Sequence, residues 1–232
     1  MIRIKFFGDN FYHIYNRGVD KRKIFLDKKD YHRFVYNLYE LNDDGKVTNQ
    51  KRRLSCNELS YIRKKGKSRE ILVEILCYCL MPNHFHLVLK QLKPNGISKF
   101  MHKLGTGYTL YFNQKHKRSG RLFQNSFRGI LIEDDKYFLH LSRYIHLNPI
   151  KLIFSKWEEK GVKSWKKANE FLQRYKWSSY LDYTDMPNTP FILKKDFLQG
   201  YFKDSMDYKK FVNEWMVDDI KEIDDLSLSV RG

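Results

Sequence analysis

The sequence predicts an α+β fold: a ferredoxin-like antiparallel sheet with helices packed on it, followed by a helical C-terminal extension. Segments of strand and helix character follow one another in the order strand, helix, strand, strand, helix, strand, helix. The two consecutive strands in the middle form an antiparallel hairpin. Elements of both kinds around such a hairpin are typical of an α+β sandwich.

The first elements are a strand and a helix. Residues 9–16 are rich in β-formers and are followed by Gly18, which indicates a strand. Apolar and aromatic residues at helical spacing predict a helix from Asp27 to Leu41. The segment from Asn42 to Arg69 is polar and basic, which predicts a long loop, either as a solvated surface or as a lobe that contacts DNA.

The central hairpin follows this loop. The apolar run from Ile71 to Leu80 is broken only by Glu74 and predicts a buried strand. Pro82 and Asn83 favour a turn, because proline cannot donate to a sheet ladder and asparagine tolerates turn geometry. Residues 84–89 then form the return strand.

A second helix and a further strand come next. Apolar residues predict a helix from Ser98 to about Gln114, although Gly105 and Gly107 weaken it. Residues 115–121 form a basic loop, and residues 127–133 have the pattern of a strand.

The last part of the chain is predicted to be mainly helical. Asp134 and Asp135 can cap a helix that runs to about Leu147, ahead of Pro149. We therefore expect a main domain at residues 1–150 and a helical extension, packed on it, at residues 151–232. Within the extension, helices are expected at residues 163–175 and 194–216, and the acidic segment 217–225 is expected to fray.

Composition limits the classes of protein. Hydrophobic residues make up 42% of the 232 residues and aromatics 16%, which is enough to bury a core. Lys and Arg total 44 against 27 Asp and Glu, and the formal charge of +17 indicates a polyanionic partner: DNA, RNA or an acidic membrane. No apolar run approaches the ~20 residues that a membrane span requires, so a membrane partner is not expected.

The cysteines indicate the compartment. Cys56, Cys77 and Cys79 form neither a disulfide framework nor a Cys-x-x-Cys zinc motif. Cys77 and Cys79 share one face of an apolar segment, which favours plain buried packing. We therefore expect a reducing, cytoplasmic location.

His84 and His86 are candidate metal ligands. Residues i and i+2 of a strand face the same side, about 6–7 Å apart, so two imidazoles can converge on one cation while Phe85 faces the core. The alternative is a pair of hydrogen-bonded or exposed histidines. Polar rings in an apolar central strand need a partner, which strengthens the case for a metal.

The helix that starts near Asp134 adds a second group of polar residues. His140, Tyr144 and Asn148 follow one another at intervals of four, so they stack on one helix face. Alone, Tyr144 is typical of an amphipathic helix and Asn148 of a helix end before proline. Together with the two histidines, they make a candidate site of two imidazoles, an amide oxygen and a phenol.

Four motifs carry a family resemblance. They are Met-Pro-Asn-His84-Phe-His86-Leu-Val-Leu, Gly120-Arg-Leu-Phe-Gln124-Asn-Ser-Phe-Arg128, Tyr144-Ile-His-Leu-Asn148-Pro149 and Trp177-Ser-Ser-Tyr180. In this order they resemble the REP-associated tyrosine transposases, relatives of the single-tyrosine transposases in the HUH endonuclease superfamily. The resemblance covers residues 8–185 and implies an HUH catalytic domain in residues 1–150.

The resemblance implies a role for each matching residue. His84 and His86 match the paired histidines that bind a divalent metal. Tyr144 matches the nucleophile, and Asn148 matches the polar position that supplies a third metal ligand. His140 is not a defining family residue, so it is a candidate either for contacting a metal ligand without binding the metal itself or for contacting DNA.

The implied chemistry explains why these groups are needed. A phenol of pKa ~10 is ionised in only about one molecule in a thousand at neutral pH. A metal on two imidazoles and an amide oxygen would polarise the scissile phosphate and orient it. Such ligands suit Mg²⁺ or Mn²⁺, two imidazoles favour Mn²⁺ slightly, and zinc stays open. Attack by Tyr144 gives a 5′-phosphotyrosine and a 3′-OH, so rejoining needs no nucleotide cofactor.

The implied substrate is single-stranded DNA or the base of a hairpin, because a stiff duplex resists placing one phosphate in a deep site. The resemblance implies short imperfect-palindrome hairpins with an adjacent tetranucleotide. Phe123 or Tyr111 can stack on bases, and the affinity should fall steeply with salt. The candidate DNA-binding residues are Lys103, Lys115, Lys117, Arg118, Arg121 and Arg128.

Three hypotheses about function stay open. The first is an endonuclease and strand transferase that acts in DNA transposition, in which Tyr108 and Tyr111 are the other candidate nucleophiles. The second is a non-cleaving regulator that binds hairpin DNA or RNA and tolerates Phe at position 144. The third is a structural metal protein. A monomer is favoured over a homodimer, and a nucleoid-associated location is expected.

Overall fold

The computed structural model describes residues 5–45 and 69–216. The chain divides into two compact units, which we call the sheet unit and the helical unit. The sheet unit comprises Met1–Leu76, Leu80–Ile132 and Phe191–Lys194, and the helical unit comprises Cys77–Cys79, Glu133–Pro190 and Lys195–Gly232. The expected division into residues 1–150 and 151–232 stays a prediction.

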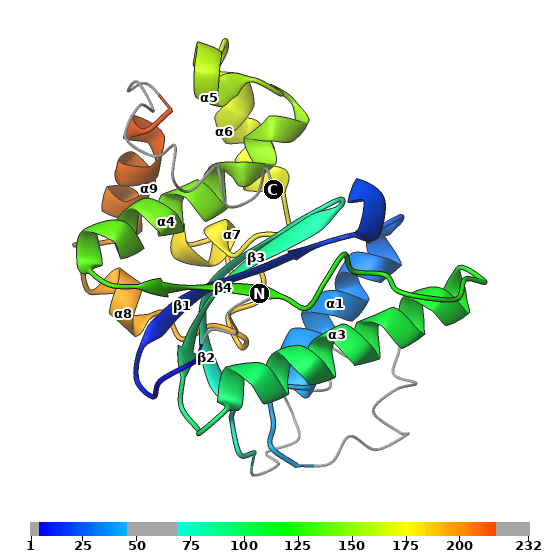
Figure 1. Cartoon of the computed structure of the whole chain (residues 1–232). Coiled ribbons are helices and arrows are strands. Elements are labelled where there is room, and N and C mark those ends of the chain that lie inside the picture. The colour runs from blue at the N-terminus through cyan, green and yellow to red at the C-terminus, as the bar shows by residue number, and fades with distance from the viewer. Residues whose placement is uncertain (1–4, 46–68, 217–232) are drawn as a thin grey trace. The chain divides into compact units, whose positions relative to one another are not determined.

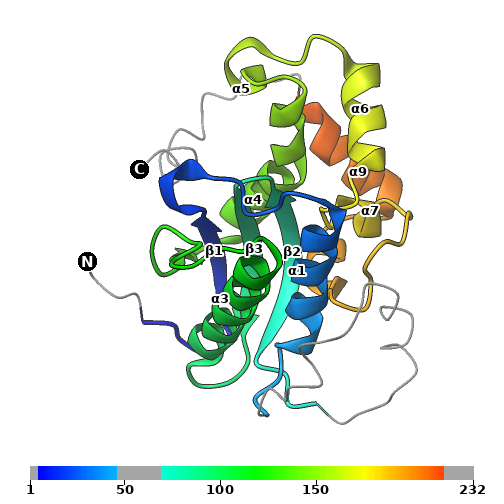
Figure 2. The same ribbon diagram turned by 90° about the vertical axis from the view of Figure 1, so that its right-hand side faces the viewer.

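The sheet has four strands in the order β2-β3-β1-β4. In this order β1 pairs antiparallel with both β3 and β4, and the helices α1 and α3 lie side by side on one face of the sheet (Figure 1, Figure 2). The order of strands and helices is that of a ferredoxin-like fold, so the predicted fold class is confirmed. The elements are β1 (Phe11–Arg17), η1 (Val19–Lys21), α1 (Lys28–Glu40), β2 (Val73–Met81), β3 (His84–Gln91), α3 (Gly96–Lys115) and β4 (Arg128–Ile132).

Local chemistry explains how the two helices form and meet. Asp27 caps α1: its side chain accepts a hydrogen bond from the backbone N–H of Asp30, and the Asp30 side chain accepts one from the backbone N–H of Asp27, as in a capping box. The glycines expected to weaken the second helix do not interrupt it. A Cβ atom on Gly107 would lie 3.1 Å from Leu41 Cδ1, so the missing side chain lets α3 approach the end of α1 closely.

The predicted hairpin turn between β2 and β3 is confirmed, and the preceding chain holds it in place. The carbonyl of Pro82 accepts a 2.8 Å hydrogen bond from the Ile24 N–H. The carbonyl of Asn83 accepts one of 2.9 Å from the Gly18 N–H. These two hydrogen bonds hold the backbone of the turn that precedes His84, the first residue of β3.

The helical unit begins where the sheet ends. Asp134 caps its first helix, as predicted, by accepting a 2.7 Å hydrogen bond from the Tyr137 N–H. Pro149 lies in a 3₁₀ turn that continues directly from this helix. The elements are α4 (Asp135–Leu147), η4 (Asn148–Leu152), α5 (Trp157–Lys160), α6 (Trp165–Arg174), α7 (Tyr180–Tyr183), α8 (Asp196–Gln199) and α9 (Ser205–Glu214).

One helix prediction was wrong. Instead of a single helix over residues 194–216, the chain forms the short α8 and then α9. Gly200 follows the last residue of α8, and the side chain of Asp204 accepts a 2.8 Å hydrogen bond from the Asp207 N–H and starts a new helix.

Residues 46–68 of the predicted basic loop and the acidic segment 217–225 lie outside the described residues. Cys77 and Cys79 are fully buried, as predicted. In the described parts of the chain, no helix has both the length and the apolar character needed to cross a membrane.

Candidate active site

The predicted histidine pair lies at the start of β3. The ring centroids of His84 and His86 are 5.1 Å apart, with the ring planes at 89° to each other. Between them, Phe85 is 2% exposed and contacts Phe34 of α1, on the face that the helices cover. Strand alternation thus places the two imidazoles together on the other face, as predicted.

In both histidines the Nδ1 atom lies within hydrogen-bond distance of a neighbouring side chain. His84 Nδ1 lies 2.7 Å from Asn83 Oδ1. Because an amide oxygen can only accept, this Nδ1 carries the proton, and the lone pair of the ring is then on Nε2. His86 Nδ1 lies 2.9 Å from Nε2 of His13, which is on β1.

Sequence reasoning placed His13 in a strand but gave it no role. Its side chain is fully buried, and this burial lowers its pKa to about 3, so the ring is neutral near pH 7. The alternation of residues on β1 puts His13 on the same face as Tyr15, whose register partner is His86. The signal that could have identified His13 is this shared face, which depends on the pairing of β1 with β3.

The predicted nucleophile lies in the helical unit, near the end of α4. Tyr144 is 4% exposed, and burial raises the pKa of its phenol while the positive charge of Lys151 opposes this rise. The Nζ of Lys151 is 5.2 Å from the Tyr144 ring centroid and 2.9 Å from Glu158 Oε1. The phenol is therefore neutral at pH 7 and has a cation beside it.

Asn148 ends α4, one turn after Tyr144. It is 1% exposed, and within the described residues its Oδ1 and Nδ2 make no hydrogen bond of normal geometry. Its amide still lies near enough to the Tyr144 phenol to lower the pKa of that group. A buried amide with unused hydrogen-bonding capacity is unusual, and its oxygen suits a hard cation.

The motif that contains Tyr144 also anchors α4. His146 Nδ1 lies 2.5 Å from the hydroxyl oxygen of Tyr208, and its Nε2 lies 2.8 Å from Ser179 Oγ. Ser179 Oγ accepts a 2.8 Å hydrogen bond from the Tyr78 N–H. This buried network joins the Tyr-Ile-His-Leu-Asn and Trp-Ser-Ser-Tyr motifs inside the helical unit, a contact that sequence reasoning missed.

His140 faces another part of the helical unit. Its Nδ1 lies 2.6 Å from an Arg143 guanidinium nitrogen, and its ring centroid is 6.1 Å from that of Trp215. The guanidinium carbon Cζ of Arg143 lies 4.6 Å from the ring centroid of Phe211 and 4.6 Å from that of Trp215. The expected role of His140 in metal support or DNA contact stays a prediction.

The alternative nucleophiles are engaged in the packing of α3, as predicted. Tyr108 is fully buried and donates a 2.5 Å hydrogen bond to the Ile24 carbonyl. Tyr111 donates to Asp30 Oδ1 at 3.3 Å. Both hydroxyls therefore have structural partners inside the sheet unit.

The six candidate DNA-binding residues differ in their surroundings. Lys115 Nζ is 2.7 Å from Asp27 Oδ1 and 2.6 Å from Asp30 Oδ1. Lys103 donates to backbone carbonyls, one of them Gly45 at 2.8 Å, and Arg118 donates to Asn113 Oδ1 at 2.8 Å. The three others are exposed on the segment that leads from α3 into β4: Lys117, Arg121 and Arg128.

The predicted metal ligands have donor atoms of the kinds that a divalent metal binds: imidazole nitrogens in His84 and His86 and an amide oxygen in Asn148. No three His, Cys, Asp or Glu side chains gather as a metal site anywhere in residues 5–45 and 69–216. The predicted set differs from such a cluster because it combines two imidazoles with an amide. His84 and His86 lie in the sheet unit and Asn148 in the helical unit.

The fold and the predicted site residues can be compared with known proteins. A four-stranded antiparallel sheet contains the His-Phe-His strand, and a helix in which Tyr144 and Asn148 lie one turn apart follows it along the chain. Residues 46–148 match the model of the family described as IS200-like transposases. This segment contains His84, His86, Tyr144 and Asn148, so the predicted family resemblance is confirmed there.

The chain is also similar to solved structures. A solved structure described as a REP-associated tyrosine transposase bound to a REP hairpin is similar to this chain, with a TM-score of 0.49 and 14% sequence identity. The similarity covers 78% of this chain and 83% of that one. No curated protein matches the chain.

Proposed function

We propose that this protein is a metal-dependent endonuclease and strand transferase for single-stranded DNA, acting in transposition. The observation that carries the proposal is the hydrogen bonding of His84 and His86, whose Nδ1 atoms both contact protein groups. Nε2 is then the nitrogen of each ring that can ligate a cation. The match of residues 46–148 to IS200-like transposases supports the same conclusion.

The reaction that follows is a transesterification at Tyr144. Its Oη attacks the phosphorus of a phosphodiester, and the bond from phosphorus to the 3′ oxygen breaks. In the net balance the phenol proton ends on that oxygen, which leaves a 3′-OH and a 5′-phosphotyrosine. The reverse reaction with another 3′-OH rejoins the strand without an energy source.

His84, His86 and Asn148 are the residues that would hold Mg²⁺ or Mn²⁺. Such an ion supplies charge stabilisation at the phosphate oxygens. Lys151 supplies further positive charge beside the phenol, where negative charge is delocalised as the attack begins. The exposed Lys117, Arg121 and Arg128 are the residues proposed to contact the phosphates of a hairpin, with Phe123 available for stacking.

A second function is favoured by the burial of Tyr144. Because its side chain is 4% exposed, a phosphate must displace neighbouring groups before the phenol can attack. A regulator that binds hairpin DNA without cutting it would not need that displacement. The two functions predict opposite results for Tyr144→Phe, because binding tolerates this change and cleavage does not.

A cleavage assay tests the proposal. Labelled single-stranded hairpin DNA from the flanks of the gene is incubated with Mn²⁺, Mg²⁺ or EDTA, and with wild type, Tyr144→Phe or Tyr111→Phe. We expect a metal-dependent cut and a covalent protein–DNA band with wild type and Tyr111→Phe, and neither with Tyr144→Phe. Cutting that survives in Tyr144→Phe would move the nucleophile elsewhere, and binding without cutting would favour the regulator.

A further inference from the structure

We propose that His13 is a positioning residue for the metal site: its Nε2 accepts a hydrogen bond from His86 Nδ1–H and so directs His86 Nε2 toward a divalent cation. The inference rests on the proposed metal-dependent function. It adds to that function a residue on a different strand, 73 positions away in the sequence.

The geometry shows why His13 can act on His86 alone. His13 Nε2 and His86 Nδ1 are 2.9 Å apart, with ring centroids 5.1 Å apart and ring planes at 20°. The ring of Tyr15 flanks both imidazoles, with centroids 5.0 Å from His13 and 6.0 Å from His86. His84 has its own partner, Asn83, so the two candidate ligands are oriented by separate groups.

The proton in the His13–His86 hydrogen bond can belong to either ring, and the two arrangements have opposite consequences. If His13 donates, the neutral His86 ring carries its proton on Nε2, and that nitrogen cannot bind a metal. If His86 donates, its lone pair lies on Nε2 and the ring is ready to ligate. A cation at His86 Nε2 is compatible only with the second arrangement.

Among the described residues, His13 has one polar side-chain partner that could take this proton. The ring is fully buried, and within the described part of the chain its Nδ1 has no hydrogen-bond partner. The hydrogen bond of the His13 ring in the structure is thus the one between its Nε2 and His86 Nδ1. Hydrogen bonds of this kind fix the tautomer and the ring orientation of metal-ligating histidines, and their loss typically weakens metal binding 10–100-fold.

Metal affinity measured without DNA tests the inference. Mn²⁺ binding is titrated by calorimetry for wild type, His13→Leu and His13→Gln, with thermal melting of each to confirm the fold. We expect His13→Leu to bind Mn²⁺ about 10–100-fold more weakly. His13→Gln retains a side-chain acceptor and should stay within a few-fold of wild type.

Two controls separate a positioning role from a general effect on the sheet. Tyr12→Phe removes a partly buried hydrogen bond from the neighbouring position of β1, on the opposite face, and should leave Mn²⁺ affinity unchanged. His86→Ala should abolish binding at this site. ¹⁵N spectra of the histidine rings with Mg²⁺ should show His86 protonated at Nδ1 in wild type, and a changed tautomer balance in His13→Leu.

The outcomes distinguish this inference from the proposed function. Equal Mn²⁺ affinity of His13→Leu and His13→Gln, whether strong or weak, would overturn the role of His13 as an acceptor. In that case metal-dependent cleavage by wild type would still support the endonuclease. Wild-type protein that binds no Mn²⁺ would overturn both the inference and the metal-dependent function.

Discussion

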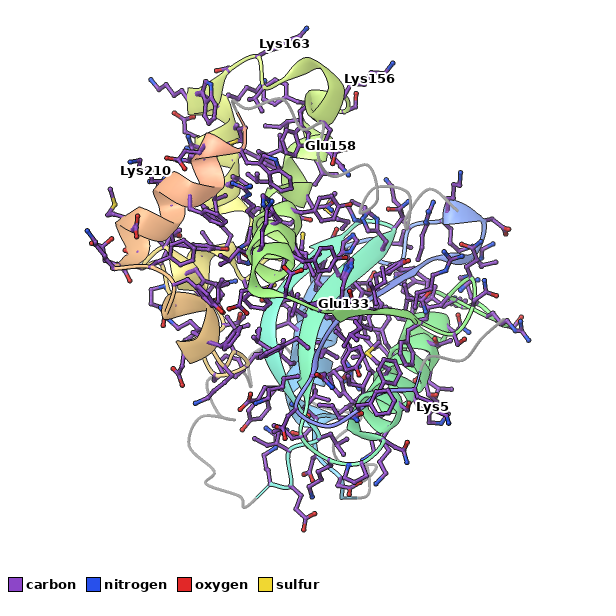
Figure 3. All side chains as sticks on the ribbon, turned by 60° about the vertical axis from the view of Figure 1, so that its left-hand side comes forward. Lys5, Glu133, Lys156, Glu158, Lys163 and Lys210 are labelled. Carbon is purple, nitrogen blue, oxygen red and sulfur yellow. The ribbon has the colours of Figure 1, made fainter. Side chains whose placement is uncertain are left out.

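Lys151 Nζ lies 5.2 Å from the centre of the Tyr144 ring, and its positive charge opposes the rise in the pKa of the phenol that burial causes. Glu158, which extends from α5 (Figure 3), pairs with Lys151 at 2.9 Å and limits that effect. The helical unit therefore contains a charge pair next to the proposed nucleophile.

This contact predicts that Lys151→Met slows strand cleavage. The attacking oxygen passes from a neutral phenol toward a phosphate ester, and a neighbouring cation stabilises negative charge on the way. We expect a decrease of about tenfold in the single-turnover rate, which corresponds to ~1.4 kcal/mol, with a smaller decrease for Lys151→Arg. Lys156→Met, at an exposed lysine that projects outward nearby (Figure 3), should cleave like wild type. Equal rates for Lys151→Met and wild type would exclude an electrostatic role.

The His146 network predicts a loss of stability when Ser179 is truncated. Ser179→Ala removes the partner of the Tyr78 N–H and of His146 Nε2, both of which are fully buried. We expect the free energy of unfolding to fall by about 1–3 kcal/mol, because buried polar groups are left unsatisfied. Ser155→Ala, at an exposed serine in the same unit, should change it by less than about 0.5 kcal/mol. Similar denaturant midpoints for the two variants would contradict the network.

The parts of this architecture that follow from short-range patterns could be predicted. Strand alternation was enough to place His84 and His86 on one face, with Phe85 on the other. Helical periodicity was enough to place Asn148 one turn after Tyr144, and Asp134 marked the start of that helix. In each case the pattern that supports the prediction lies within a single strand or helix.

The parts that depend on pairing between distant segments could not be predicted. The contact of His13 with His86 requires the register of β1 against β3, which no local pattern fixes. The position of Lys151 depends on the 3₁₀ turn that continues past Pro149. The break between α8 and α9 is different, because Asp204, which caps α9, is a local signal that was available in the sequence.

The ion pair between Asp27 and Lys115 predicts a pH dependence of stability. Burial acts to raise the pKa of Asp27, but the hydrogen bond and charge of Lys115 outweigh it, so the pKa lies below its ordinary value. A carboxyl with a lowered pKa stabilises the fold above its ordinary pKa, and this contribution is lost as the pH falls through the lowered one.

Thermal melting of Asp27→Asn beside wild type tests this dependence. Asn still caps α1 but carries no charge, so its melting temperature should be lower than that of wild type at pH 7. The difference should start to shrink as the pH falls below about 4, the ordinary pKa of an aspartate, and should continue to shrink as the pH passes through the lowered pKa of Asp27. Glu133→Gln, at an exposed glutamate, serves as the control. A difference that stays constant from pH 7 to pH 3 would show that the charge does not contribute.

The different surroundings of the basic residues predict which of them contact DNA. Lys117 and Arg121 are exposed, whereas Lys115 is held by two carboxylates. A cation that neutralises a phosphate releases counterions, so each lost contact should reduce the slope of log affinity against log salt by about 0.7–0.9. We expect this reduction for Lys117→Ala and Arg121→Ala, measured with hairpin DNA at several salt concentrations. Lys115→Ala should instead lower the melting temperature and leave the slope unchanged. A reduced slope in Lys115→Ala would mean that DNA competes with Asp27 and Asp30 for this lysine, and the DNA-binding surface would then extend over the end of α3.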